Sequence, residues 1–235
     1  MNDLDIEHLN GVFESASPQE ILRWAWETFA PGVACSSSFQ TQSVPLLHII
    51  AQTCPEMPVF FIDTGFHFPE TLTFRDTLRT SLGLNIRILH PTVTQSELLQ
   101  QYGEALYRRD PDLCCYIHKV QPLEWALKRM KAWISGVRRD QTQAREGMQV
   151  LERQPDGLLR IHPLLTWTKA DVKAYREAHA LPAHPLEALG YKSIGCAPCT
   201  RPVLIGEDER AGRWAGTDKK ECGLHLDWSK KKDVP

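Results

Sequence analysis

The sequence predicts an α/β fold in which a parallel β-sheet is flanked by helices. Four short apolar runs have the length of strands, and each is followed by a loop and a helical pattern. Strands that alternate with helices pair in parallel, because each crossover helix returns the chain to the same end of the sheet. The four runs are residues 32–35, 59–62, 86–89 and 132–135.

Clear N-terminal signals mark three of the helices. Ser17 is followed by Pro18 at the first helical position and by Glu20, the pattern of a capping box. The same logic applies to Thr94 with Glu97 and to Thr168 with Asp171.

The composition is that of an ordinary globular protein, with 42% hydrophobic and 24% charged residues in a chain of 235. The net charge of −2 predicts no nucleic-acid partner, and the short apolar runs predict no membrane partner. The acidic N-terminus lacks the pattern of a signal peptide, so a cytoplasmic protein is expected. Residues 1–205 are expected to form one domain, and the charged residues 206–235 a mobile tail.

Polar loops follow the first and fourth predicted strands, at the sheet edge where ligands of such folds bind. Ser36 and Ser38 precede a helix start, where hydroxyls and backbone N–H groups can hold an anion. The same loop would also serve only to cap a helix. Gly136 and three arginines follow the fourth strand, and arginine suits phosphate and sulfate because its fork bonds two oxygens. Taken alone, Arg138, Arg139 and Arg145 would be interpreted as surface arginines at a solvated helix start.

Seven cysteines in a chain expected to be cytoplasmic favour metal binding or thiol chemistry over disulfides. An adjacent pair and a C-x-x-C pair together offer four thiolates, which suits a [4Fe–4S] cluster or a structural zinc. Zinc sites usually combine two spaced pairs, so the adjacent pair fits zinc poorly. The four are Cys114, Cys115, Cys196 and Cys199, whereas Cys35 and Cys54 are assigned to packing.

The seventh cysteine, Cys222, stands apart from this set. Lys219, Lys220 and His225 flank it, and cationic neighbours lower the pKa of a thiol. Alone, such a residue would be an incidental cysteine on a tail.

Several motifs, in the same order along the chain, give a resemblance that covers about residues 35–225. Residues 219–225 (KKECGLH) resemble the catalytic signature of the assimilatory adenylyl-sulfate and phosphoadenylyl-sulfate reductases. The cysteine segments, 114–123 (CCYIHKVQPL) and 190–200 (GYKSIGCAPCT), resemble the branch of that family that carries a [4Fe–4S] cluster. The serine-rich loop is similar to the modified P-loop of this adenine nucleotide alpha hydrolase-like fold, and residues 63–65 (DTG) to a turn within it.

The resemblance implies a Rossmann-like enzyme that reduces adenylyl sulfate to sulfite and AMP, for cysteine biosynthesis. It implies Cys222 as the nucleophile on the tail, an S-sulfocysteine intermediate, and thioredoxin or glutaredoxin as reductant. A homo-oligomer is also expected. The four cysteines named above would hold the cluster. The residues that the resemblance assigns to substrate binding are Ser36, Ser38, Lys119, Gly136, Arg145, Arg210, Arg213 and His225.

Two departures and three alternatives accompany this interpretation. His118 stands where many relatives have arginine, and Gln40 where a glycine is frequent. The phosphorylated nucleotide, or both nucleotides, are alternative substrates. A tRNA-thiolating enzyme would need an intact S-G-G-x-D-S loop and a basic surface, and neither is found here. An iron–sulfur redox sensor would have no use for the segment around Cys222.

Overall fold

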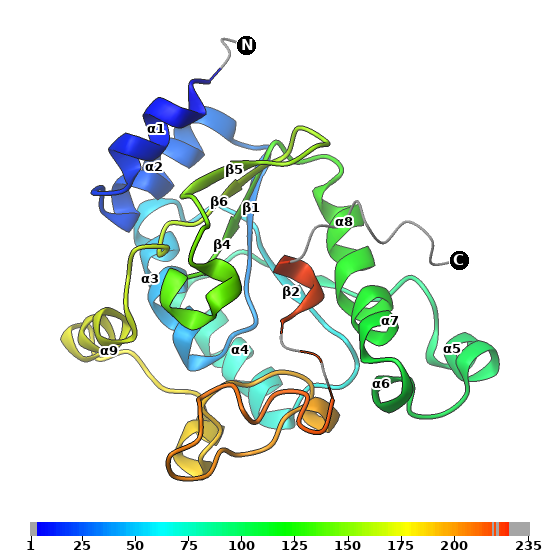
Figure 1. Cartoon of the computed structure of the whole chain (residues 1–235). Coiled ribbons are helices and arrows are strands. Elements are labelled where there is room, and N and C mark those ends of the chain that lie inside the picture. Colours follow the sequence, from blue (N-terminus) through cyan, green and yellow to red (C-terminus); the bar gives the residue numbers. More distant parts are fainter. Residues whose placement is uncertain (1–3, 218, 220, 226–235) are drawn as a thin grey trace. The chain divides into compact units, whose positions relative to one another are not determined.

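The four predicted strands lie side by side in a six-stranded sheet in the computed structural model, which describes residues 4–217, 219 and 221–225. The strand order is β3-β2-β1-β4-β6-β5. Figure 1 labels every strand of this sheet except β3. β1 pairs in parallel with β2 and β4, and β4 pairs in parallel with β6. The strands are β1 (Val33–Ser36), β2 (Val59–Ile62), β3 (Ile86–Leu89), β4 (Ala132–Ser135), β5 (Leu151–Arg153) and β6 (Leu159–Ile161).

The last two strands were not among those expected, and β5 pairs with β6 in the antiparallel direction. The turn between them contains Pro155, Asp156 and Gly157, and Gly157 takes the positive φ of 88° that glycine tolerates. The side chain of Asn10 bonds the carbonyl and the N–H of Leu151 at 3.0 and 2.8 Å. A side chain from a helix therefore occupies the unpaired backbone groups of this edge strand.

The capping boxes predicted for three helices are confirmed. Ser17 Oγ accepts from the Glu20 N–H, and Glu20 accepts in return from the Ser17 N–H. The Thr94 and Thr168 boxes have the same reciprocal bonds. The helices are α1 (Ile6–Phe13), α2 (Pro18–Phe29), α3 (Val44–Thr53), α4 (Pro69–Leu82), α5 (Gln95–Tyr102), α6 (Leu106–Arg109), α7 (Pro111–Cys115), α8 (Gln121–Leu127) and α9 (Lys169–Ala178).

The chain divides into two units, each assembled from three stretches of sequence. Unit 1 comprises residues up to 61, 75–87 and 129–183, and unit 2 comprises residues 62–74, 88–128 and 184 onward. In unit 1, α2 packs against α3 and α3 against α9, and the strand residues Val33, Val59 and Ile134 are fully buried. The predicted boundary at residue 206 stays a prediction. None of the helices within the described ranges has the length and apolar character needed to cross a membrane.

Candidate functional site

Unit 2 brings the two predicted cysteine pairs to one pocket. Cys114 and Cys115 end α7, whose N-terminus is capped by Asp110 through a 2.8 Å bond from the Leu113 N–H. Both cysteines line the pocket together with Cys196 and Cys199. All four are free thiols. Among the residues that the structure describes, no three His, Cys, Asp or Glu side chains are arranged to hold one metal ion.

Hydrogen bonds hold the C-x-x-C turn in place. Thr200 Oγ1 donates to the Cys196 carbonyl at 2.9 Å and accepts from the Gly195 N–H at 3.2 Å. Thr64 Oγ1 lies 3.4 Å from Cys196 Sγ. A Cβ at Gly195 would lie 2.5 Å from the guanidinium of Arg213, so only glycine lets this arginine cross the turn. The sulfur positions are therefore set by the surrounding backbone.

Lys119 places a half-buried positive charge among these sulfurs. It lies on a π-helical turn, Tyr116–Val120, between α7 and α8, and π-helical turns are frequent at functional sites. Burial opposes its charged form, but the charges of Cys196, Cys115 and Cys222 outweigh burial and raise the pKa of the ammonium. Lys119 therefore stays protonated and attracts thiolates.

The thiol pKa values in the pocket differ in a consistent way. Burial acts to raise the pKa of Cys196, but the charge of Lys119, hydrogen bonds from Thr64 and Lys119, and Arg213 together lower it. Burial raises the pKa of Cys114 to about 12 and that of Cys199 to about 11. Cys196 is thus the cysteine of the pocket that ionises most easily among these three.

His118, the departure from the family pattern, also lines this pocket. Its ring lies 5.1 Å from the ring of Phe66, and its Nδ1 has no hydrogen-bond partner among the described atoms. Burial lowers the pKa of the imidazole, against the opposing effect of the Thr64 carbonyl. A neutral imidazole at this position lacks the permanent charge that an arginine would supply.

Cys222 is held by the residue before it. One oxygen of Glu221, Oε1, accepts from the Cys222 N–H at 2.8 Å and from Arg210 Nη2 at 3.2 Å. A Cβ on Gly223 would lie 3.2 Å from Val120 Cγ2, so the backbone here packs closely on the π-helical turn that carries Lys119. Lys219 forms an ion pair with Asp112 of α7. Through these contacts the segment is seated on the elements that carry Cys115 and Lys119.

The predicted cations of the C-terminal segment gather around one indole. The Arg213 guanidinium lies 4.4 Å from the ring of Trp214, and Lys219 Nζ lies 5.5 Å from it. Arg213 also bonds Ser193 Oγ and the Ile194 carbonyl, both at 3.4 Å. The side chain of His225, another predicted binding residue, lies outside what the structure describes.

The serine-rich loop of unit 1 begins where β1 ends. Ser36 Oγ accepts from Trp133 Nε1 at 2.8 Å, and Ser37 Oγ accepts from the Phe39 N–H at 3.1 Å. Ser38 is exposed. Phe39 has a positive φ of 54° and packs on Phe61 with ring centroids 5.6 Å apart, which anchors this bend of the loop in the core.

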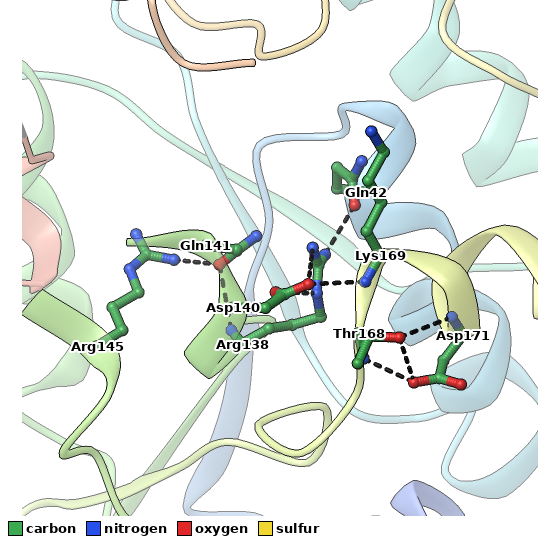
Figure 2. Close-up of polar contacts among 8 residues, drawn as sticks. All are labelled: Gln42, Arg138, Asp140, Gln141, Arg145, Thr168, Lys169 and Asp171. Carbon is green, nitrogen blue, oxygen red and sulfur yellow. Dashed lines mark hydrogen bonds and ion pairs between the residues drawn. The ribbon is translucent and has the colours of Figure 1, made fainter. Parts of the chain in front are cut away.

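A polar network ties the loop after β4 to the turn that precedes α3 and to the start of α9 (Figure 2). Arg138 donates to Gln42 Oε1 at 2.7 Å and to Asp140 Oδ1 at 2.9 Å. Asp140 Oδ2 accepts from the Lys169 N–H at 2.7 Å, at the start of α9. Arg138 therefore has a structural part in this loop.

Gln141 joins this network to Arg145. Its Oε1 accepts from the Arg138 N–H at 3.1 Å and from Arg145 Nη1, as Figure 2 shows. Arg145 is buried, whereas Arg139 turns outward to an ion pair with Glu14. Of the three arginines, Arg145 is the one whose guanidinium is held inside the loop by Gln141.

Replacing Gln141 with alanine is expected to lower the free energy of unfolding by about 1–3 kcal/mol, because two buried donors lose their shared acceptor. Urea denaturation measures this loss. Gln143→Ala is the matched control at an exposed position of the same loop, and it should change stability by less than about 0.5 kcal/mol. Equal stability of the two variants would contradict the role given to Gln141.

Three polar residues of unit 1 lie near the strand ends although the motifs did not indicate them. Ser135 Oγ lies 2.8 Å from His162 Nδ1, and His162 Nε2 lies 3.5 Å from Glu152 Oε2. Ser135 was visible as the last residue of a predicted strand. The β5–β6 hairpin, which the sequence did not predict, brings His162 and Glu152 to Ser135. Only knowledge of how these strands pair could have indicated the two residues.

Taken together, the fold is that of nucleotide-binding α/β proteins, and the cysteine pocket adds thiol chemistry. A family model described as the phosphoadenosine phosphosulfate reductase domain matches residues 32–202. An adenosine 5'-phosphosulfate reductase of Streptomyces coelicolor is 45% identical over 220 residues, which cover 93% of this chain and 92% of the relative. A phosphoadenosine 5'-phosphosulfate reductase of Gloeobacter violaceus is 41% identical and covers 94% of this chain and 93% of the relative.

The fold agrees with a solved structure of the same kind. The crystal structure of phosphoadenylyl-sulfate reductase from Candida auris, a phosphate complex, superposes with a TM-score of 0.73 at 33% identity. The match covers 84% of this chain and 98% of that chain. The chain belongs to the adenylyl-sulfate and phosphoadenylyl-sulfate reductase family, as its motifs predicted. It is accordingly an oxidoreductase that acts on a sulfur compound.

Proposed function

We propose that this chain reduces adenylyl sulfate to sulfite and AMP, with Cys222 as the nucleophile. The observation that carries the proposal is the close packing of the Cys222 segment on the π-helical turn of Lys119, where a Cβ on Gly223 would lie 3.2 Å from Val120 Cγ2. The thiolate is the reactive form of cysteine, and a cation on this turn would attract an anionic sulfate. Relatives that are 39–48% identical and are named adenosine 5'-phosphosulfate reductases support the choice of substrate.

The reaction would take place in two stages, each a nucleophilic attack by a thiolate on sulfur. The Cys222 thiolate attacks the sulfate sulfur, the bond from that sulfur to the phosphate oxygen breaks, and AMP leaves with the electron pair. A thiolate of thioredoxin or glutaredoxin then attacks Cys222 Sγ, and sulfite leaves with the electron pair of the broken S–S bond. The second thiol of the reductant resolves the mixed disulfide and restores the Cys222 thiol. The reductant is thus oxidised to its disulfide, and the sulfate sulfur is reduced to sulfite.

Cationic side chains would offset the repulsion between an anionic nucleophile and an anionic sulfate. In unit 2 the candidates are Lys119, Arg210, Arg213 and His225. In unit 1 the candidates for binding the nucleotide are Ser36, Ser38, Gly136 and Arg145. For Ser36 the support is its position at the end of β1, with its oxygen already accepting from Trp133.

A [4Fe–4S] cluster is proposed to be held by Cys114, Cys115, Cys196 and Cys199. The donor set fits, because such a cluster takes one thiolate on each of four irons and does not need ligands converging on one ion. The pocket lined by all four cysteines, the half-buried Lys119 that favours thiolates and the unpartnered Nδ1 of His118 support the fit. When bound, the cluster would organise these segments and tune the field around Lys119 without transferring electrons.

The phosphorylated nucleotide is the alternative substrate. The relatives from Gloeobacter violaceus and Candida auris are both named as reductases of that nucleotide, and they are the reason to test it. Anaerobic steady-state kinetics with reduced thioredoxin compare the two nucleotides directly. We expect kcat/KM for adenylyl sulfate to exceed that for the phosphorylated form by at least about tenfold, a difference of about 1.4 kcal/mol in transition-state binding. The reverse order would overturn the substrate assignment, and no sulfite from either nucleotide would overturn the reaction.

The remaining parts of the proposal concern the cellular setting. A cytoplasmic location, a role in sulfate assimilation for cysteine biosynthesis and assembly as a homo-oligomer go with this function. Reductant choice is decided in the same kinetic assay by replacing thioredoxin with glutaredoxin.

A further inference from the structure

Two serines end neighbouring strands at one point of the sheet. Ser36 ends β1, Ser135 ends β4, and the two are register partners. β2 and β3 lie on one side of β1, and β4 and β6 lie on the other, so the strand order reverses between β1 and β4. Ligands of open α/β sheets bind beyond the carboxyl ends of the strands at such a reversal. Both hydroxyls therefore lie at the edge where a nucleotide is expected.

The hydroxyl of Ser36 accepts a hydrogen bond from within the protein. Trp133 Nε1 lies 2.8 Å from Ser36 Oγ, and an indole nitrogen can only donate. The indole is fixed, because Trp133 is 1% exposed and the Arg160 guanidinium stacks 4.9 Å from its ring. The hydrogen of the Ser36 hydroxyl therefore remains available for an acceptor such as a phosphate or sulfate oxygen.

The hydroxyl of Ser135, in contrast, donates its hydrogen to the protein. Its partner, His162 Nδ1, lies 2.8 Å away. Nε2 of the same ring faces Glu152 Oε2 at 3.5 Å, a contact whose geometry does not make a hydrogen bond. A carboxylate repels the lone pair of a ring nitrogen, so the hydrogen of a neutral His162 belongs on Nε2 and its Nδ1 accepts. Ser135 must then donate to Nδ1. Its oxygen lone pairs are what remains for a ligand.

The ionisation of this pair agrees with the assignment. Burial lowers the pKa of His162 even though Glu152 opposes it, and the nearby charges of Arg160 and Arg145 act in the same direction as burial. Burial opposes ionisation of Glu152, but the contact with His162, the hydrogen bond from the Gln149 N–H and the charge of Arg160 together outweigh burial and lower the pKa of the carboxyl. Near neutral pH the pair is a neutral imidazole beside a carboxylate.

We propose that Ser135 is a specificity-determining residue that accepts a hydrogen bond from the adenosine part of the nucleotide and cannot donate one. This inference rests on the proposed function, since it assigns a role within the same nucleotide site. The group that Ser135 recognises carries an N–H or O–H, which on adenosine is the exocyclic amine or a ribose hydroxyl. Ser36 and Ser135 thus form a matched pair, one selecting an acceptor and the other a donor.

The direction of the Ser135 hydroxyl can be read in the unaltered protein. Nitrogen-15 NMR of the histidine rings, with the His162 signals assigned by their loss in His162→Gln, reports which ring nitrogen carries hydrogen. We expect hydrogen on Nε2 and none on Nδ1. A ring with hydrogen on Nδ1, whether neutral or doubly protonated, would overturn the proposal, because Ser135 would then accept from His162.

Calorimetric binding to the full chain, purified anaerobically, identifies the recognised group. The probes are AMP, its 2'-deoxy and 3'-deoxy analogues, and purine riboside monophosphate, which lacks the exocyclic amine. Ser135→Ala should weaken AMP binding by about tenfold, the cost of one buried donor left unpaired. For the one analogue that lacks the recognised donor, the same substitution should have little effect, as in a double-mutant cycle.

Ser36→Ala is the matched control, and it should weaken binding of all four nucleotides by a common factor. If Ser135→Ala leaves AMP binding unchanged, or weakens all four alike, the proposal is overturned. Because nucleotide binding requires no thiol chemistry, this failure differs from failure of the proposed function. Turnover that persists without the Cys222 thiol would overturn that function and leave these binding results unaffected.

Discussion

Replacing Cys222 with serine is expected to lower sulfite release by roughly a thousandfold or more, the loss typical when a nucleophile is removed. A serine hydroxyl stays protonated beside Lys119 and is a much weaker nucleophile than a thiolate. Nucleotide binding should change by less than about threefold, because no substrate-binding candidate is altered. Sulfite release is measured with reduced thioredoxin, and binding by calorimetry with AMP.

The S-sulfocysteine intermediate allows a direct test of Cys222 as the nucleophile. When the wild-type protein meets adenylyl sulfate without reductant, mass spectrometry should find one sulfonate group on the peptide that contains Cys222. Cys54→Ala is the control, because burial raises the pKa of the Cys54 thiol to about 12 and keeps it unreactive. Full turnover by Cys222→Ser, or a sulfonate on another cysteine, would refute the assignment of the nucleophile.

Replacing Cys199 with alanine is expected to remove the cluster and with it nearly all activity. Three thiolates remain in the pocket, and one iron of a four-iron cluster would lose its protein ligand. Iron and acid-labile sulfide are measured in protein purified anaerobically, together with the visible absorbance. We expect about four irons per chain for the wild-type protein and less than about one for the variant.

The control separates loss of the cluster from loss of the fold. Cys54→Ala removes a cysteine outside the pocket and should keep its iron and sulfide. Far-ultraviolet circular dichroism of both variants should match the wild type, since neither Cys54 nor Cys199 lies within a strand or an α-helix. A Cys199→Ala variant with full iron content, or a colourless wild type that remains active, would refute the cluster proposal.

Much of the fold could be predicted because its signals are local. A capping box needs only residues three apart, and the four parallel strands are short apolar runs with clear boundaries. The β5–β6 hairpin was missed because each strand has three residues, although the Pro155-Asp156-Gly157 turn could have indicated it. The family was recognisable from its motifs, and the family model over residues 32–202 and the curated relatives confirm the family.

The geometry of the site could not be predicted in the same way. The motifs indicated Lys119, but its π-helical turn is an irregularity that hydrophobic periodicity does not register. The partners of Arg138 come from Gln42 and Asp140, and the first of these lies about 100 residues away, in another element. The Ser135–His162–Glu152 chain depends on strand register, which no local pattern specifies.

The parallel pairing of β1 with β4 also has a consequence for synthesis on the ribosome. Val33 pairs with Ala132, so β1 leaves the ribosome about 100 residues before its partner β4 is synthesised. At about 5–20 residues per second, an apolar strand waits about 5–20 s with that edge unpaired. Expression of this protein should therefore depend on chaperones that shield nascent chains, and slowing translation before residue 132 should increase aggregation.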